Sequence, residues 1–200
     1  MALHVRVMPL TRYLCGGARD DAGAVRRRVQ ILQSLVTRKA GRPIAWRDEG
    51  ETLLDEELPA EAWDALRAFA ADRGSAAAGS AAGAAGRAYP LLEQVRRGQH
   101  ALHPHLVRGD ARRAVYVPCD FPEPLSADEE QLSIGSSVGL LRELNILAGP
   151  LRMRLDQGEP GWTDQFERAD ALELPRMAWA LLRWCARLSV QHRLPVIIGG

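Results

Sequence analysis

Residues 173–198, ELPRMAWALLRWCARLSVQHRLPVII, carry the clearest fold signal in this chain. Apolar side chains recur every three or four residues, which predicts a helix over about 173–192 with one buried face. The run 195–198 is short and apolar, and it predicts a strand inside a sheet. The residues expected on the buried side of the helix are Leu174, Met177, Ala178, Leu181, Leu182, Cys185 and Leu188.

The other segments of the chain also contain both helical spacing, with apolar residues every three or four positions, and strand spacing, with apolar residues at every second position. Period-two alternation over 2–8 predicts a strand that ends at Pro9. Strands and helices do not alternate regularly, so the expected fold class is α+β, a small mixed or antiparallel sheet packed with four to five helices. The remaining expected helices are 21–39, 59–72, 90–97 and 136–148, and the remaining expected strands are 43–47, 114–117 and 151–155.

The chain length and composition suit one domain. The 200 residues are 46% hydrophobic, enough to build a single core without a metal or disulfide. Residues 74–88, GSAAAGSAAGAAGRA, bury little apolar surface and are costly to order. We therefore expect residues 1–200 to form a single α+β domain with a flexible loop at about 74–88.

The charge balance excludes a strong global attraction to nucleic acid or to a membrane, because the net charge is +1. Residues 1–118 carry 18 basic and 13 acidic side chains, whereas residues 119–200 carry 8 and 12. We interpret this asymmetry as internal pairing, with a basic partner-binding face as the alternative. Lys39 is the single lysine, and the arginine, alanine and glycine content indicates a GC-rich, bacterial coding bias.

The cysteines and the N-terminal sequence indicate a cytoplasmic protein. Cys15, Cys119 and Cys185 are odd in number and widely spaced, which argues against a disulfide framework. The N-terminal residues alternate and lack the apolar core of a signal peptide. No apolar run approaches the ~18 residues that a membrane span requires.

One motif suggests a serine hydrolase. Residues 135–139, GSSVG, match G-x-S-x-G, with Ser137 as the nucleophile. An acid and a histidine follow in the expected order, His192 being preceded by Asp170 or, alternatively, by Asp156 or Asp164. However, residues 128–133 are too polar for the buried strand that should precede such a serine. The other interpretation is a glycine turn in which a serine caps the next helix.

A histidine cluster suggests a metal site. His100, His103 and His105 lie close together in the sequence, and Cys119 follows. Imidazole and thiolate are good zinc ligands, although this spacing matches no specific metal motif. Solvated histidines in a turn, and a packed cysteine rather than a nucleophilic one, are the alternatives.

Arginines and tryptophans are the remaining candidates for binding. Arg26, Arg27 and Arg28 fan over roughly 200° of a helix, so they do not form one concentrated nucleic-acid-binding face. Tryptophans are common in binding hot spots, and the candidates here are Trp162, Trp179 and Trp184. Because Trp179 and Trp184 are five residues apart, they cannot share the centre of one buried stripe.

No candidate site is complete, so the sequence favours a cytosolic interaction protein without catalysis. We expect it to bind another protein, as a toxin-neutralising (immunity-like) or regulatory factor, and to need no cofactor. Nucleic-acid binding is possible but not favoured. The competing hypothesis is an enzyme, either a hydrolase that uses Ser137 or a metal-dependent enzyme that uses the histidines.

Overall fold

A six-stranded sheet with the order β2-β1-β6-β3-β5-β4 organises the protein. The computed structural model describes residues 2–15, 21–74, 102–108, 113–127, 132–156 and 170–199. The strands are β1 Ala2–Val7, β2 Leu54–Pro59, β3 Arg113–Val117, β4 Leu125–Ala127, β5 Leu132–Ser136 and β6 Val196–Gly199. The helices within the described residues are α1 Leu10–Leu14, α2 Ala22–Ala40, α3 Ala60–Gly74, α5 Pro104–Val107, α6 Ser137–Ala148 and α7 Glu173–His192.

The sheet is mixed. The strands β3 and β5 run parallel, and the other paired strands run antiparallel. The C-terminal strand β6 lies between β1 and β3, and its residues Val196, Ile197 and Ile198 are buried. This central position explains why the segment is apolar on both faces. The architecture is the expected α+β fold.

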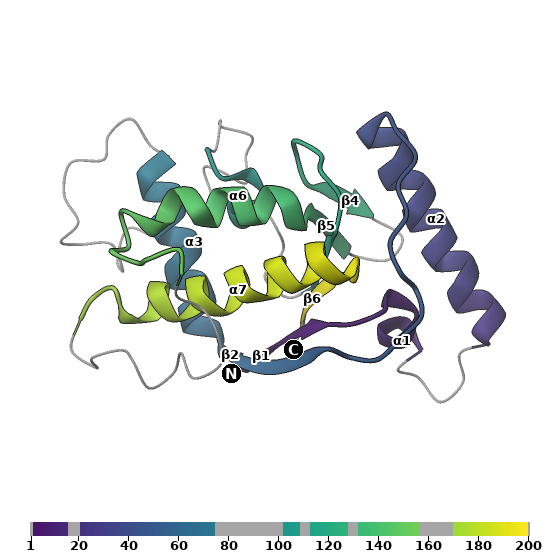
Figure 1. The fold of residues 1–200 in the computed structure, drawn as a ribbon, viewed down its shortest axis with the longest axis horizontal. Helices are drawn as coiled ribbons and strands as arrows, with labels where there is room; N and C mark the ends of the chain where they lie inside the picture. Colours follow the sequence, from purple (N-terminus) through teal and green to yellow (C-terminus); the bar gives the residue numbers. More distant parts are fainter. Residues whose placement is uncertain are drawn as a thin grey trace.

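The two faces of the sheet pack against different helices (Figure 1). Residues such as Val5 and Tyr116 join α3, α6 and α7 in one core. Residues such as Val115 and Ile134 point the other way and pack against Val36 of α2. Alternation along each strand therefore gives the sheet two apolar faces.

The most periodic segments are confirmed. The expected helices at 21–39, 59–72, 136–148 and 173–192 correspond to α2, α3, α6 and α7, and the expected strands at 2–8, 114–117 and 195–198 correspond to β1, β3 and β6. In α2 the side chain of Asp21 accepts a hydrogen bond from the amide of Gly23, and Gly41 ends the helix with a left-handed φ of 67°. A residue with a side chain would be strained at that position.

Several weaker predictions are wrong. Residues 43–47 form a loop, and residues 151–155 form a turn in which Arg152 has a φ of 56°. The strands β2, β4 and β5 were not predicted, because charged or small residues interrupt their apolar pattern. Leu174 is 39% exposed rather than buried. The expected loop at 74–88 (beyond Gly74) and the expected helix at 90–97 lie outside the described residues.

Candidate protein-binding surface

The G-x-S-x-G motif lies at the turn between β5 and α6. The prediction that the preceding residues could not form a buried strand is wrong, because Leu132 and Ile134 alternate into the core. The Ser137 side chain is nevertheless fully buried. Its hydroxyl donates to the Tyr116 carbonyl at 3.1 Å and lies 2.7 Å from the Ser189 hydroxyl.

The structure does not bring Ser137, Asp170 and His192 together as a hydrogen-bonded set. The Asp170 carboxylate accepts from the Leu172 amide and the Arg176 guanidinium, and the first of these is the main cause of its lowered pKa. His192 lies at the end of α7. Among the described residues, no imidazole or carboxylate is hydrogen-bonded to the Ser137 hydroxyl.

The glycines of the motif are required by packing. A Cβ atom on Gly139 would lie 2.3 Å from Cδ2 of His105, and a Cβ atom on Gly135 would lie 2.4 Å from Cδ1 of Tyr116. Both distances are far below any normal contact, and both neighbours are ring atoms of buried side chains. Close packing of two rings against the backbone thus accounts for the motif in structural terms.

The imidazole of His105 is held by hydrogen bonds on both nitrogens. Its Nδ1 accepts from the Ser136 amide at 3.2 Å, so Nε2 carries the proton and donates to the Phe121 carbonyl at 2.9 Å. Burial lowers the pKa of His105, which keeps the ring neutral. Both nitrogens are therefore occupied, and neither is free to bind a metal.

Two buried ionisable side chains hold the short helix α5. The Glu143 carboxylate accepts from the amides of His105 and Leu106 at 2.9 and 2.8 Å. At the other end, Arg67 donates to the carbonyls of Leu106 and Val107 at 3.3 and 2.8 Å. The negative and positive groups thus match the positive and negative ends of the helix. Burial raises the pKa of Glu143 to about 7.

We refer to the side chains of Arg67, His105, Tyr116, Ser136 and Glu143 as the α5 network. The hydroxyl of Tyr116 donates to the His105 carbonyl at 3.0 Å. The hydroxyl of Ser136 donates to the Cys119 carbonyl and accepts from the Gly139 amide, which caps α6. Every member therefore bonds to main-chain groups, and the network fixes the fold.

The other metal candidates are not assembled into a site. His100 lies outside the described residues, and His103 is buried with its pKa lowered by burial. Burial raises the pKa of the Cys119 thiol to about 12, so the thiol stays protonated. Within the described ranges, no group of three or more His, Cys, Asp or Glu side chains could hold a metal ion.

The tryptophans occupy different environments. Trp179 is fully buried, and its indole N–H donates to the Leu144 carbonyl at 2.6 Å. A core residue of this kind cannot contact a partner on the surface. Trp184 is partly exposed and packs against the edge of the same core, as its spacing from Trp179 requires. Trp162 lies outside the described residues.

The surface feature missed by the sequence predictions is a local reversal of charge. Residues 22–47 contain seven Arg or Lys and no Asp or Glu, whereas residues 48–66 contain eight Asp or Glu and no Arg or Lys. Both blocks lie within residues 1–118, so a charge count over that whole segment combines them and does not show the reversal. A shorter counting window would have found them.

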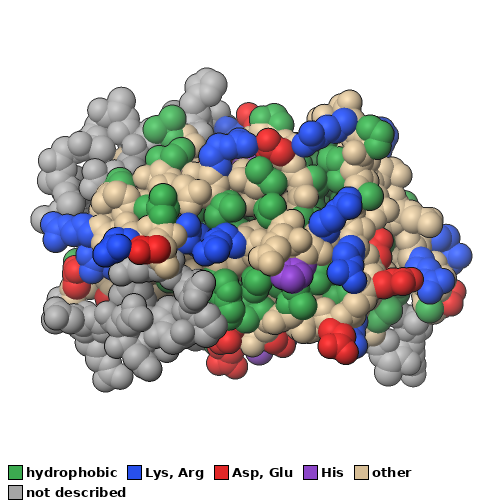
Figure 2. All heavy atoms as spheres, viewed as in Figure 1, with side chains coloured by type: hydrophobic (Ala, Val, Ile, Leu, Met, Phe, Trp, Pro, Cys, Tyr) green, Lys and Arg blue, Asp and Glu red, His purple; other side chains and the backbone are tan. Residues whose placement is uncertain are grey.

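The acidic block forms one edge of the molecule. It covers the loop before β2, the strand β2 itself and the first turns of α3, and β2 is an end strand of the sheet. Acidic side chains line the lower edge in Figure 2, where Figure 1 places β2. We call this surface the acidic edge. Its exposed residues are Glu49, Glu51, Asp55, Glu56, Glu57, Glu61 and Asp64.

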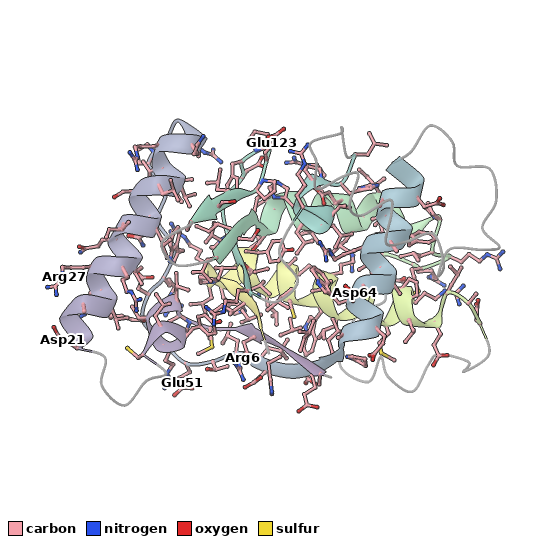
Figure 3. All side chains as sticks on the ribbon, turned by 180° about the vertical axis from the view of Figure 1, so that it is seen from behind. Arg6, Asp21, Arg27, Glu51, Asp64 and Glu123 are labelled. Carbon is pink, nitrogen blue, oxygen red and sulfur yellow. The ribbon has the colours of Figure 1, made fainter. Side chains whose placement is uncertain are left out.

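Most carboxylates of the acidic edge have no ion-pair partner in the part of the chain that the structure describes. Asp55 accepts from Arg6 at 3.0 Å and lies 3.3 Å from His4, both on β1. Asp64 lies 3.8 Å from Arg67. Figure 3 shows Arg6 between Glu51 and Asp64 along this side of the molecule. The other members have no ion pair within the described residues: Glu49, Glu51, Glu56, Glu57 and Glu61.

Comparison with protein families identifies the class. The model of the family described as "Putative DNA-mimic protein" matches residues 1–198, so the chain belongs to this family. DNA mimics bind proteins, such as DNA-binding enzymes, and do not act on them catalytically. No curated protein matches the chain, and no solved structure matches it. No helix in the described residues has the length and apolar character needed to cross a membrane.

Proposed function

We propose that this protein binds a DNA-binding protein through the acidic edge, with carboxylates in the place of DNA phosphates. The observation that carries the proposal is the set of exposed carboxylates on β2 and its flanking segments, most of which have no ion pair among the described residues, in a chain of the DNA-mimic family. More specifically, we propose that the partner is a toxin or a regulatory protein that acts on DNA.

The chemistry of the edge supports this function. Proteins bind the DNA backbone mainly through Lys and Arg side chains that neutralise phosphates. A carboxylate also accepts charge-assisted hydrogen bonds from Lys and from the fork of Arg. Unpaired carboxylates are needed for such binding, because an internal ion pair would have to be broken first.

The linear density of charge also supports it. A strand rises about 3.3 Å per residue, and phosphates of one DNA strand follow one another about every 3.4 Å along the helix axis. Asp55, Glu56 and Glu57 are consecutive residues of β2. The strand therefore spaces acidic residues about as closely as one DNA strand spaces its phosphates. Because Arg6 pairs with Asp55, Glu56 and Glu57 carry the charge that remains for a partner, one on each face of β2.

A matched pair of variants tests the proposal. The edge variant is E56Q/E57Q/E61Q, and the control variant is D120N/E123Q/D156N. Both remove three negative charges, but the control residues lie outside the acidic edge, as Glu123 does in Figure 3. Proteins retained from a bacterial lysate by the immobilised wild type are eluted with double-stranded DNA, identified and purified for affinity measurements.

We expect the edge variant to bind a DNA-eluted partner more weakly than the wild type. Three exposed charges at about 0.5 kcal/mol each amount to about 1.5 kcal/mol, on the order of tenfold in Kd. The edge variant should also show a shallower dependence of affinity on salt. Equal weakening by the control variant, or no partner that DNA can displace, contradicts the proposal.

A further inference from the structure

Among the residues that the structure describes, the acidic edge is also an open strand edge. β2 pairs antiparallel with β1 over Leu54–Pro59, and it is the last strand on that side of the sheet. Within the described residues, no strand pairs with its other side. In an antiparallel strand with one partner, every second residue directs its N–H and C=O groups away from that partner. β2 therefore presents a row of main-chain donors and acceptors in the middle of the acidic edge.

The acidic side chains lie on both faces of this strand. Glu56 has the same parity as the buried Leu54 and Leu58, and it lies on the face toward α3 and α7. Asp55 and Glu57 lie on the opposite face, where Asp55 contacts Arg6 of β1. A strand that pairs with β2 thus meets negative charge above and below its main chain.

This arrangement selects against a second copy of the chain. If two β2 strands paired antiparallel about Glu56, Asp55 of each copy would lie opposite Glu57 of the other. Like charges in directly opposite positions destabilise a strand pair. Acidic side chains on an edge strand therefore prevent the self-association that an open edge otherwise invites.

We propose that the occupant of this edge is an extended basic segment of the partner, which adds to the sheet as a further strand beside β2. The proposal rests on the function proposed above and names the binding mode at the same surface. Main-chain hydrogen bonds to β2 give affinity, and Arg or Lys side chains facing Glu56 and Glu57 give selectivity. Basic arms of DNA-binding proteins have this composition, and they are disordered until they bind.

The charge complementarity places specific demands on the segment. Glu56 and Glu57 project to opposite faces, so the segment needs basic residues at neighbouring positions, one for each face. Asp55 is already paired with Arg6 and lies near His4, so the segment does not need a basic residue opposite Asp55. Arginine fits better than lysine, because its planar fork matches a carboxylate with two hydrogen bonds.

The test uses two synthetic peptides with the same charge. The first alternates Arg-Arg and Thr-Thr pairs, which provides basic residues on both faces of a strand. The second has the same sequence with N-methyl groups on central residues of both parities, so neither edge of the peptide can donate to β2. Fluorescence anisotropy gives the affinity of each for the full-length protein. Hydrogen exchange reports the protection of the β2 amides.

We expect the unmodified peptide to bind about 30-fold more tightly, the difference for two main-chain hydrogen bonds, and to slow exchange in β2. It should bind weakly to E56Q/E57Q. Equal affinity of the two peptides, with loss of both in E56Q/E57Q, overturns strand addition but leaves the acidic edge as the binding surface. Binding of the unmodified peptide that is unchanged in E56Q/E57Q overturns both proposals. If neither peptide binds, the addition of a basic strand is overturned, and the proposed function is decided by the partner experiment above.

Discussion

The α5 network and the acidic edge treat polar side chains in opposite ways. In the network, buried side chains such as Glu143 and His105 form their hydrogen bonds with main-chain groups of the protein itself. On the edge, carboxylates such as Glu56 and Glu57 are exposed and have no ion pair within the described residues. A polar group is therefore available to a partner only where the fold has not already given it a hydrogen bond or an ion pair.

The largest expected effect is on the network. In Gly139→Ala the new methyl group would displace the His105 imidazole and leave the Ser136 amide and the Phe121 carbonyl without a partner. Overpacking together with two unsatisfied buried groups should lower the free energy of unfolding by about 4 kcal/mol. Urea unfolding followed by circular dichroism measures this change.

The matched control is Gly149→Ala. Gly149 follows α6 with φ of −59°, and a Cβ there meets nothing within 4 Å. We expect its stability to stay within about 0.5 kcal/mol of the wild type. Equal effects of the two substitutions would show that the His105 packing does not matter for stability.

The next effect is a pH dependence. Burial raises the pKa of Glu143 from 4.5 to about 7, so between these values the folded state keeps a proton that the unfolded state has lost. The stability contributed by Glu143 therefore falls as the pH rises through this window. His103 and His105, with lowered pKa values, contribute in the opposite direction below pH 6.5.

The variant Glu143→Gln isolates the carboxyl group, because it retains both histidines. The unfolding free energy of the wild type minus that of the variant should fall by about 3 kcal/mol from below pH 4.5 to above pH 7. Denaturant titrations across this range give the difference. A constant difference would mean that the two amide hydrogen bonds to Glu143 fully offset its burial.

Smaller effects are expected where the groups are exposed. Asp55→Asn removes the charge that faces Arg6 and His4 and should cost about 0.5 kcal/mol, as exposed ion pairs do. High salt should reduce the difference between this variant and the wild type. A loss comparable with that of Gly139→Ala would place Asp55 with the network rather than with the edge.

The smallest effect on stability is expected for the edge variant E56Q/E57Q/E61Q. These carboxylates have no ion pair within the described residues. Relief of repulsion among like charges and loss of the Glu61 charge from the first turn of α3 act in opposite directions, so the unfolding free energy should change by less than about 0.5 kcal/mol. Thermal unfolding of the variant checks this. A clear loss of stability would mean that the edge serves the fold and is not reserved for a partner.

The sequence predicted the parts of the fold that depend on long periodic segments. The four long helices and β1, β3 and β6 follow from spacing and from caps such as Asp21 and Gly41. The strand β2 was missed because Asp55, Glu56 and Glu57 look like a solvated loop unless one knows that they lie on a sheet edge. Its only apolar signals, Leu54 and Leu58, are four residues apart, which also fits a helix.

The site was harder to predict than the fold. Ser137, His105 and Cys119 were candidates because their residue types are reactive, but burial and hydrogen bonding decide reactivity, and a sequence does not display either. The acidic edge was visible as composition. Only the position of β2 at the end of the sheet shows that these charges lie together on one surface.

The most direct test of the proposed function is competition between this protein and DNA for the same partner. A partner captured as described is bound to a short fluorescent DNA duplex, and the wild-type protein is titrated in. We predict complete displacement of the duplex by the wild type, and displacement that needs on the order of tenfold more of E56Q/E57Q/E61Q. A ternary complex of partner, DNA and this protein would contradict the account, because the acidic edge would then not occupy the DNA-binding surface.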